Sequence, residues 1–285
     1  MKNRLKKFLR KNQFLYMVFS NTLNYNKRRK ERYYDSAMSN AIEGTIVVTI
    51  KNIPGEFEID SRSDILKRIL LTKEYEPEIV TFILKSIANN KDVINIGANI
   101  GLYANLLADN IHSNRVLAIE PTTKAYELLI KNIDRNHNTN KIIAYKGIAT
   151  NMEGDFEINT IHGKEEYSSI GSLVHDATRN EIYSKEKVIG NKLDTLILKY
   201  GLIPGLIVID VEGAEMKVLL GAKASLEKYR PIIISELDDT LLTEQNTSSK
   251  HLISFLQGLN YSVKSIDGEK PTYPFSGNVI AIPNK

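Results

Sequence analysis

The chain has 285 residues, a length that predicts one sizeable domain with an extension rather than several domains. Hydrophobic residues make up 42% and charged residues 25%, which is typical of a globular protein and excludes collagen-like and low-complexity chains. The lack of cysteine in the sequence excludes a disulfide framework, thiolate metal sites and a cysteine nucleophile.

The first segment of the chain, residues 1–40, is predicted to be a basic amphipathic arm. Residues 1–34 hold eleven Lys and Arg against one Glu, whereas the whole chain carries a net charge of +4, so the rest of the chain is acidic. Apolar residues recur at helical spacing between Leu5 and Phe19. Two roles stay open: residues 1–34 make peripheral contact with an anionic membrane surface, or they pack on the acidic body.

The expected location follows from what the sequence does not contain. No apolar run approaches the length needed to span a bilayer, and the apolar residues 14–19 lack a signal-peptide cleavage pattern. We therefore expect a cytoplasmic protein. If the arm binds a membrane, the protein is expected at the inner membrane surface as a peripheral protein.

Residues 41–90 are predicted to form a hairpin and helices that pack on the core. The hairpin strands are expected at 45–51 and 56–60, with the turn at Pro54 and Gly55. Helices are expected to follow, up to about residue 89.

From residue 91 to 285, short apolar runs alternate with helical patterns, which indicates an α/β domain. The continuous runs predict strands buried on both faces of a mostly parallel sheet, with helices on both faces. The predicted strands are 93–96, 116–119, 142–145, 206–209 and 232–234. The predicted helices are 99–109, 122–136, 214–229 and 247–259. Two last strands, 261–266 and 278–283, are expected to form an antiparallel C-terminal edge.

Residues 151–192 interrupt this alternation. They are expected to hold two short strands around a polar loop that includes Ser168, Ser169, Ser172 and His175. A long excursion after the carboxyl end of a strand is typical of a lid or substrate loop, which we favour. The alternative is an ordered edge hairpin with no part in the chemistry.

A glycine turn followed by an acid indicates a nucleoside site. Gly97 stands where a strand turns into a helix, and Gly101 opens that helix, whose N-terminus favours anionic groups. Glu120 ends the next strand, where an acid binds the ribose hydroxyls of an adenosine-containing cofactor. The pattern alone does not separate dinucleotides from S-adenosylmethionine, but Asn99 occupies the second glycine position of the dinucleotide motif and disfavours the former.

Four short segments follow one another along the chain: residues 95–103, Ile119-Glu120-Pro121, Leu193-Asp194-Thr195 and Ile209-Asp-Val-Glu-Gly-Ala-Glu215. Together they resemble the FkbM-type family of S-adenosylmethionine-dependent methyltransferases over about residues 75–267. The resemblance implies a class I, Rossmann-like fold. It also implies methylation of hydroxyl groups on sugars, polysaccharide precursors or polyketides.

The resemblance also implies where the donor binds. Its methionine end is expected against Asn95, Gly97 and Asn99, and its ribose on Glu120. Two positions depart from the family: Asn95 replaces the usual Asp, and Val208 stands where Lys is common. An amide oxygen at residue 95 still accepts a hydrogen bond from the donor's ammonium group, directly or through water, but without charge assistance.

The expected chemistry needs a group that takes the proton of the acceptor hydroxyl. Asp210, Glu212 and Glu236 follow neighbouring predicted strands and are the candidate catalytic residues. The same oxygen atoms would suit a divalent cation such as Mg²⁺ or Ca²⁺, but we favour the alternative without a metal. His162 and His175 in the polar loop are further candidates for the base.

We therefore predict an S-adenosylmethionine-dependent O-methyltransferase whose small-molecule or glycan acceptor is a sugar or a polysaccharide or glycolipid precursor. One alternative is an RNA ribose methyltransferase with the arm as phosphate anchor, which the acidic body disfavours. The other is a catalytically silent, adenosine-binding scaffold, suggested by Asn95 and Val208. The oligomeric state is not predicted.

Overall fold

The computed structural model describes residues 29, 44–88, 90–112, 114–169 and 183–284. The chain divides into two units, residues 1–44 and 45–285, and the fold described below is that of the second unit. The predicted arm, residues 1–40, lies outside the described residues except for Arg29. In the described part of the chain, no helix is both long enough and apolar enough to cross a membrane.

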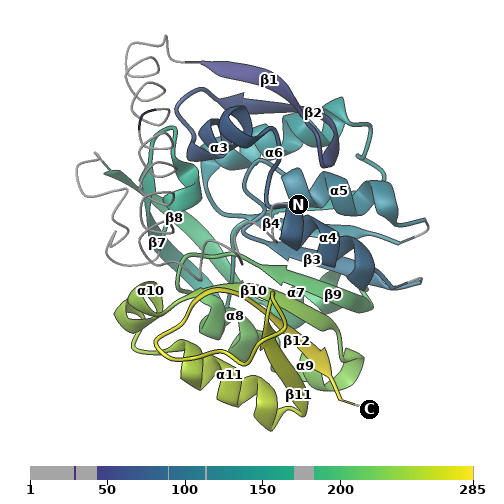
Figure 1. Ribbon diagram of the computed structural model, residues 1–285, viewed down its shortest axis with the longest axis vertical. Coiled ribbons are helices and arrows are strands. Elements are labelled where there is room, and N and C mark those ends of the chain that lie inside the picture. The colour runs from purple at the N-terminus through teal and green to yellow at the C-terminus, as the bar shows by residue number, and fades with distance from the viewer. Residues whose placement is uncertain (1–28, 30–43, 89, 113, 170–182, 285) are drawn as a thin grey trace, which may run out of the picture. The chain divides into compact units, whose positions relative to one another are not determined.

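A seven-stranded sheet in the order β11-β12-β10-β9-β3-β4-β5 forms the centre of this unit (Figure 1). Its parallel strands are β3 (Asp92–Ile96), β4 (Val116–Glu120), β5 (Ile142–Lys146), β9 (Pro204–Ile209) and β10 (Ile232–Asp238). The remaining two, β11 (Tyr261–Ser265) and β12 (Ser276–Pro283), pair antiparallel at one edge. Every residue of β3 and β4 is buried, as the continuous apolar runs predicted. The predicted parallel sheet with an antiparallel C-terminal edge is confirmed.

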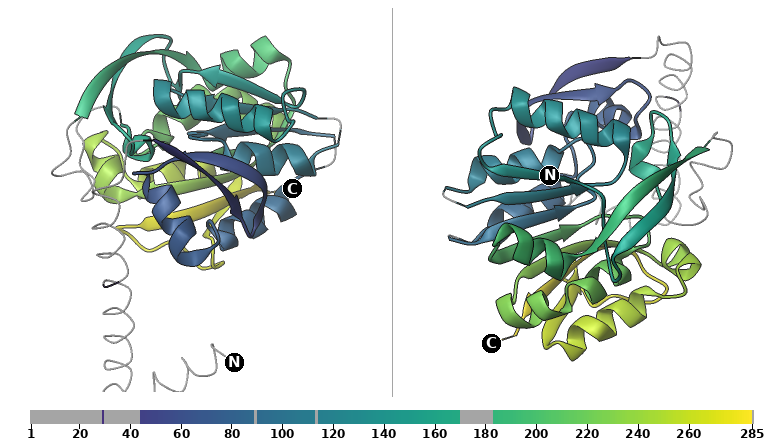
Figure 2. Two further views of the ribbon diagram at one scale, coloured as in Figure 1. Left: turned by 90° about the horizontal axis from the view of Figure 1, so that it is seen from above. Right: turned by 180° about the vertical axis from the view of Figure 1, so that it is seen from behind.

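Helices cover both faces of the sheet (Figure 2). The core on one face joins β3, β4, β9 and β10 to residues of α7 (Leu193–Tyr200), α8 (Glu215–Gly221), α9 (Lys223–Tyr229) and α11 (Ser249–Gly258). Two further helices, α5 (Leu102–Asn110) and α6 (Thr123–Arg135), contact β4 and β5. The short α10 (Asp239–Glu244) follows β10 directly. These helices cover the apolar side chains of the strands, so the hydrophobic core lies between the sheet and the helices.

The single helix expected over 214–229 is instead two helices, α8 and α9. Gly221 ends α8 so close to β6 (Ile148–Thr150) that a Cβ atom there would lie 1.9 Å from the carbonyl oxygen of Thr150. Ala222, with φ −106° and ψ 0°, separates the two helices. The helix therefore divides at the point where it approaches β6 closely enough to exclude a side chain.

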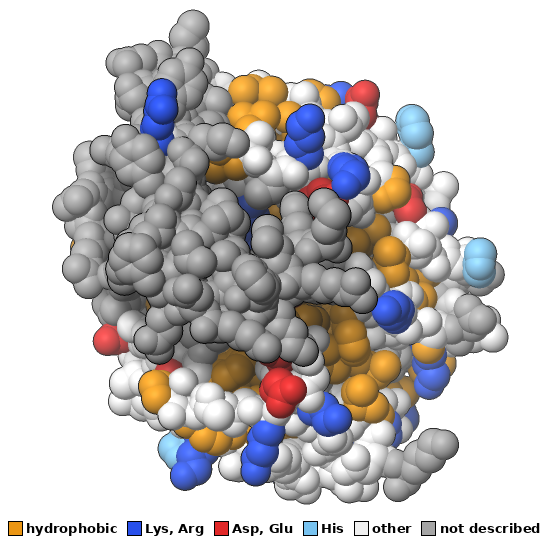
Figure 3. All heavy atoms as spheres, viewed as in Figure 1, with side chains coloured by type: hydrophobic (Ala, Val, Ile, Leu, Met, Phe, Trp, Pro, Cys, Tyr) orange, Lys and Arg blue, Asp and Glu red, His pale blue; other side chains and the backbone are white. Residues whose placement is uncertain are grey.

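The N-terminal hairpin consists of β1 (Thr45–Ile50) and β2 (Ile53–Asp60) and is followed by α3 (Asp64–Thr72) and α4 (Pro77–Ser86). Its turn lies at residues 51–52, so the expectation of a turn at Pro54 and Gly55 was wrong. Those two residues lie in β2 at a register shift and have no partner in β1. Because neither is paired, the missing N–H of Pro54 removes no hydrogen bond between the strands. Hydrophobic side chains gather on the surface over β1 (Figure 3), where Ile46 and Val47 are 41% and 45% exposed.

Two asparagines of α6 hold this hairpin against the helix. The Asn132 Oδ1 atom accepts a hydrogen bond from the Glu58 N–H at 2.7 Å, and its Nδ2 donates to the Glu58 carbonyl at 3.0 Å. Asn136 makes the same pair of bonds with the backbone of Glu56, at 3.0 and 2.9 Å. Each amide therefore forms the two backbone hydrogen bonds that a neighbouring strand would form with β2 on this side.

Asn132→Ala is expected to lower the free energy of unfolding by about 2–4 kcal/mol. Asn132 is fully buried and also donates to the Ile100 carbonyl at 2.9 Å, so its loss leaves three backbone groups without their partner. Urea unfolding measures the change. Asn136→Ala is the matched control, because Asn136 is only half-buried and water can replace its bonds; an equal loss for both variants would contradict this argument.

The excursion within 151–192 belongs to a second sheet, in the order β6-β8-β7. Its strands β7 (Gly154–Ile161) and β8 (Tyr183–Lys192) pair antiparallel over 8 residues and are longer than expected. A short 3₁₀ helix, η1 (Glu165–Tyr167), follows β7. Ser172 and His175 lie outside the described residues.

Candidate functional site

The strand register places four of the predicted site residues in one row. Ile96 of β3 is paired with Ile119 of β4 and with Ile209 of β9, and Ile209 is paired with Ser235 of β10. The next residue on each strand is therefore Gly97, Glu120, Asp210 and Glu236, respectively. This row stands at the carboxyl ends of four adjacent parallel strands, where open α/β sheets bind their ligands.

The loop after β3 is built from residues in the left-handed region. Gly97 has φ +75° and Asn99 has φ +48°, a conformation that glycine and asparagine adopt more readily than other residues. The N–H groups of Gly97 and Ala98 both donate to the Ile119 carbonyl, at 3.0 and 2.9 Å. The Asn99 side chain accepts from the Ile100 N–H at 2.7 Å. These bonds tie the loop to β4 and point the Asn99 N–H toward Glu120.

Glu120 is held at the end of β4 by three hydrogen bonds. Its carboxylate accepts from the Asn99 N–H at 2.9 Å and from the N–H and hydroxyl of Thr122 at 2.9 and 2.7 Å. Burial nevertheless raises the pKa of Glu120 to about 7, because removal from water disfavours the charged form more than these bonds favour it. The side chain lines the cavity described next and is fixed in one orientation.

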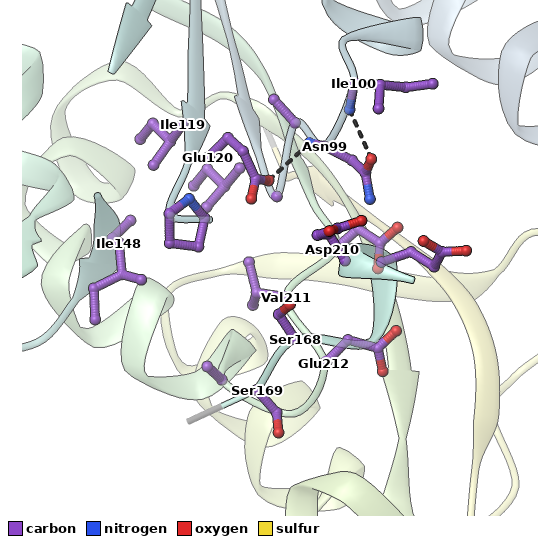
Figure 4. Close-up of a pocket in the computed structure, with 18 of the residues that line it drawn as sticks. Asn99, Ile100, Ile119, Glu120, Ile148, Ser168, Ser169, Asp210, Val211 and Glu212 are labelled. Carbon is purple, nitrogen blue, oxygen red and sulfur yellow. Dashed lines mark hydrogen bonds between the residues drawn. The ribbon is translucent and has the colours of Figure 1, made fainter. Parts of the chain in front are cut away.

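A cavity opens above this row of residues, with a volume of about 950 Å³ including the solvent at its mouth. In the view of Figure 4, Glu120, Ile119 and Ile148 lie on one side of it, and Asp210 and Glu212 lie on the other. The first side is largely apolar, and the second is acidic. The cavity therefore offers an elongated ligand an apolar wall that carries the carboxyl group of Glu120, and an opposite wall lined by two further carboxyl groups.

Asp210 and Glu212 form the acidic end. Burial and the charges of Glu236 and Glu212 raise the pKa of Asp210. Burial and the charges of Glu236 and Glu215 raise the pKa of Glu212 to about 8. Glu212 has φ +50°, a strained conformation for this residue type. Strain and repulsion of this kind are typical of functional sites and not of sites that stabilise the fold.

A second group of side chains borders the acidic end. Tyr75 and Tyr103 line the cavity with their rings 5.8 Å apart, and the Tyr103 hydroxyl donates to Glu76. The Arg68 guanidinium donates to the same carboxylate of Glu76 and lies 5.4 Å from the centre of the Tyr75 ring. This group fixes the rings as a rigid wall.

The 3₁₀ helix η1, which lines the cavity, is attached to the start of α3. The carboxylate of Glu166 accepts from the hydroxyl of Ser63 at 3.1 Å and from the Asp64 N–H at 2.7 Å, and the Tyr167 hydroxyl donates to Asp64 at 2.9 Å. Glu166 and the following Ser168 line the cavity. The hairpin of β7 and β8 therefore supplies one wall of the site.

Comparison with known proteins identifies the family. Residues 95–263 match the family model of the methyltransferase FkbM domain, which is more than half of the chain. The chain belongs to the FkbM methyltransferase family. It is a methyltransferase with the class I, Rossmann-like fold, as the resemblance in the sequence implied.

Individual relatives are distant. The hexuronic acid methyltransferase AglP of Haloferax volcanii is 22% identical over 196 residues, which are 68% of this chain and 75% of AglP. A methyltransferase FkbM from Methylobacillus flagellatus KT has a TM-score of 0.44 and 16% identity over 67% of this chain and 43% of its own. An O-methyltransferase from Bacillus cereus, solved in complex with SAH, has a TM-score of 0.45 and 14% identity over 78% and 89% of the two chains.

The structure does not bring all predicted site residues of this FkbM methyltransferase into the cavity. Asn95 is buried, does not line the cavity, and neither atom of its amide has a partner among the described residues. Gly101 also lies outside the lining: a Cβ atom there would meet the Leu129 Cδ1 atom at 2.6 Å, so it permits packing of α6. Glu236 is in the row but is not part of the lining, and His162 is exposed.

Among the described residues, no group of three or more His, Asp or Glu side chains has the arrangement that holds a metal ion.

Several residues that line the cavity of this methyltransferase are not predicted as site residues by the sequence. Tyr75 and Glu166 lie outside the four motif segments, and Tyr103 is the last residue of the first segment, 95–103, which predicts no role for it. Ser168 and Ser169 belong to the loop that the sequence predicts to be polar, and both line the cavity.

The unliganded protein is expected to lose stability between pH 6 and pH 8.5. Burial raises the pKa of Glu120, Glu166 and Glu215 to about 7 and that of Glu212 to about 8, from an ordinary 4.5. The unfolded chain binds fewer protons than the folded one over this range, so the free energy of unfolding falls as pH rises through the folded pKa values. Thermal unfolding at both pH values measures the change, and Glu212→Gln should reduce it. A constant or rising midpoint would contradict these pKa values.

Proposed function

We propose that this chain is an S-adenosylmethionine-dependent O-methyltransferase that methylates a hydroxyl group of a sugar or of a saccharide precursor. The observation that carries the proposal is that Gly97, Glu120 and Asp210 stand in one register row and line one cavity. Membership of the FkbM family supports methyl transfer, and the hexuronic acid named for AglP supports a saccharide acceptor.

The lining residues fit the donor. Ile148 and Ile158 offer an apolar wall to the adenine, and the fixed carboxylate of Glu120 is placed for the ribose hydroxyls. The acidic end with Asp210 and Glu212 fits the positive charges of the methionine end. When bound, the donor supplies an electrophilic methyl group on a sulfonium centre.

The chain's own residues then have three tasks. Asp210 in its ionised form takes the proton from the acceptor hydroxyl, and its raised pKa makes that form a stronger base than an ordinary carboxylate. The neighbouring charges of Glu212 and Glu236 maintain that raised pKa. The ring wall of Tyr75 and Tyr103 positions the acceptor and excludes water from the reacting atoms.

Isothermal titration calorimetry tests the donor site. S-adenosylmethionine and S-adenosylhomocysteine are expected to bind, and NAD⁺ is not, because the loop at Asn99 has a side chain where a dinucleotide site has glycine. Binding of NAD⁺ alone would refute the assignment of the donor.

A methyl-transfer screen with radiolabelled donor tests the acceptor. Incorporation into nucleotide sugars or glycans is the expected result. Incorporation into RNA alone would support an RNA ribose methyltransferase, and donor binding without incorporation into any acceptor would support a silent scaffold. Either result would refute the proposed acceptor class.

A further inference from the structure

Two tyrosines line the cavity, and their hydroxyl groups differ in what they bind. The Tyr103 hydroxyl donates to the carboxylate of Glu76. The Tyr75 hydroxyl makes no hydrogen bond with any residue in the part of the chain that the structure describes, although Tyr75 lines the same cavity. A tyrosine hydroxyl that is removed from bulk water normally has a partner, so this hydroxyl is available to a ligand.

The surroundings of the Tyr75 hydroxyl keep it protonated. Burial raises the pKa of Tyr75 well above its ordinary value, and the charges of Glu76, Asp210 and Glu166 act in the same direction. The charge of Arg68 acts in the opposite direction but does not outweigh them. The phenol therefore remains a hydrogen-bond donor at neutral and moderately alkaline pH.

The ring of Tyr75 is held in place by two neighbours. The Arg68 guanidinium lies 5.4 Å from the centre of the ring, and the Tyr103 ring lies 5.8 Å away at an angle of 55°. Both neighbours are themselves fixed, because each donates to the carboxylate of Glu76. The hydroxyl is thus oriented before a ligand arrives, and little side-chain entropy is lost when it binds one.

The backbone of Tyr75 is held by the turn of the N-terminal hairpin. The Asn52 Nδ2 atom donates to the Tyr75 carbonyl at 2.6 Å, and the Asn52 Oδ1 atom accepts from the Tyr75 N–H at 2.9 Å. The neighbouring Lys51 N–H donates to the Lys73 carbonyl at 3.0 Å. The hairpin therefore fixes the bend between α3 and α4, from which the Tyr75 ring reaches the cavity.

We propose that the Tyr75 hydroxyl is a further catalytic residue, which donates a hydrogen bond to the oxygen of the acceptor hydroxyl, and that Asn52 is its positioning residue. The proposal rests on the proposed function. In the reaction, the acceptor oxygen forms a bond to the methyl carbon, and the bond from that carbon to sulfur breaks with its electron pair left on sulfur. The hydroxyl proton passes to Asp210, and the Tyr75 proton stays on its own oxygen.

The hydrogen bond from Tyr75 orients the acceptor oxygen. A hydroxyl oxygen carries one proton and two lone pairs. With its proton directed at Asp210 and one lone pair bonded to Tyr75, the other lone pair is left to attack the methyl carbon, and its direction is fixed. The same hydrogen bond stabilises the negative charge that develops on this oxygen as its proton leaves.

Tyr75→Phe tests the hydroxyl because it keeps the ring. The acceptor probes are UDP-glucose, GDP-mannose and the methyl glycosides of glucose and mannose, and the sugar with the highest incorporation of radiolabelled methyl is used throughout. For this sugar, kcat/KM is expected to fall by about 10–100-fold in Tyr75→Phe. Its binding to the complex with S-adenosylhomocysteine, measured by calorimetry, should weaken by about threefold to tenfold.

The affinity for S-adenosylhomocysteine itself should stay unchanged in Tyr75→Phe, because the hydroxyl is assigned to the acceptor. Tyr229→Phe is the matched control. Tyr229 ends α9 before the amino end of β10, at the edge of the sheet opposite the cavity, so this variant should alter none of the three quantities. An unchanged kcat/KM in Tyr75→Phe, or a loss that arises from weaker binding of S-adenosylhomocysteine, would overturn the proposal.

Asn52→Ala tests the positioning role. It is expected to lower kcat/KM for the sugar by about threefold to thirtyfold in the otherwise unaltered protein, but by less than about twofold in Tyr75→Phe, because it acts through the hydroxyl. Asn136→Ala also removes two backbone hydrogen bonds of the hairpin, but at Glu56, and should leave kcat/KM unchanged. The same factor for Asn52→Ala in both backgrounds would show a merely structural role and overturn this half of the proposal.

Failure of the proposed function gives a different result. If the unaltered protein binds S-adenosylhomocysteine but methylates none of the four sugars, the proposed acceptor class is refuted, and the role of Tyr75 is refuted with it. If it binds no S-adenosylhomocysteine, the donor site is refuted. A protein that methylates a sugar equally well with and without the Tyr75 hydroxyl keeps the proposed function and refutes the role of Tyr75 alone.

Discussion

Gly97→Ala is expected to lower the free energy of unfolding by about 3–5 kcal/mol and to abolish donor binding. A Cβ atom on Gly97 would lie 1.7 Å from the carbonyl oxygen of Asp210, so β3 and β9 would have to separate where they border the cavity. The residue also has φ +75°, which costs an alanine further energy. Both effects act on the row of residues that forms the site, and the cavity cannot keep its shape.

Gly268→Ala separates the two causes. Gly268 has a similar φ of +88°, but no atom lies within 4 Å of the place its Cβ would take. This control should lose only the conformational part, about 1–2 kcal/mol, and should bind the donor as the unaltered protein does. Urea unfolding and calorimetry measure both variants. Similar losses for Gly97→Ala and Gly268→Ala would show that the close approach to Asp210 is unimportant.

Asp210→Asn is expected to reduce the rate of methyl transfer at saturating donor by about 10²–10⁴-fold while making the unliganded protein more stable above neutral pH. The amide cannot accept the acceptor's proton, so the rate falls. Because burial and neighbouring acids raise the pKa of Asp210, its ionised form destabilises the fold as pH rises, and the amide removes that cost. Loss of activity with gain of stability is the signature of a residue retained for function.

Kinetics and thermal unfolding at pH 6 and pH 8.5 test both halves of this prediction. Glu227→Gln, on the exposed face of α9, is the matched control and should change neither quantity. Full activity of Asp210→Asn would exclude Asp210 as the base. A drop in its stability at pH 8.5 would show that the carboxylate is favourably paired in the protein.

The central sheet was predictable because its signal is local. The runs at 93–96 and 116–119 are apolar without alternation, and only strands covered on both faces bury such runs. The ends of those strands were predictable for the same reason, so Gly97, Glu120 and Asp210 could be placed at one edge of the sheet before the register was known.

The errors have long-range causes. Pro54 and Gly55 have turn-forming residue types, but they lie in a strand because Asn136, 80 residues away, bonds to the backbone of Glu56. Gly221 lies in a continuous helical pattern, but α8 ends there, at a position where the carbonyl of Thr150 leaves no room for a side chain. Local propensity is weak compared with packing of this kind, so tertiary contacts prevailed.

The sequence by itself determined the class of fold, the family and the strand ends that carry Gly97, Glu120 and Asp210, because each of these depends on short segments whose pattern is read directly. Only the tertiary structure decided which side chains complete the cavity. Tyr75 reaches it from the bend between α3 and α4, and Glu166 reaches it from η1. It also decided that Asn95 is enclosed in the sheet and that the acidic end has no balancing cation in the described lining. Both depend on distances between segments far apart in the chain, which no local pattern records.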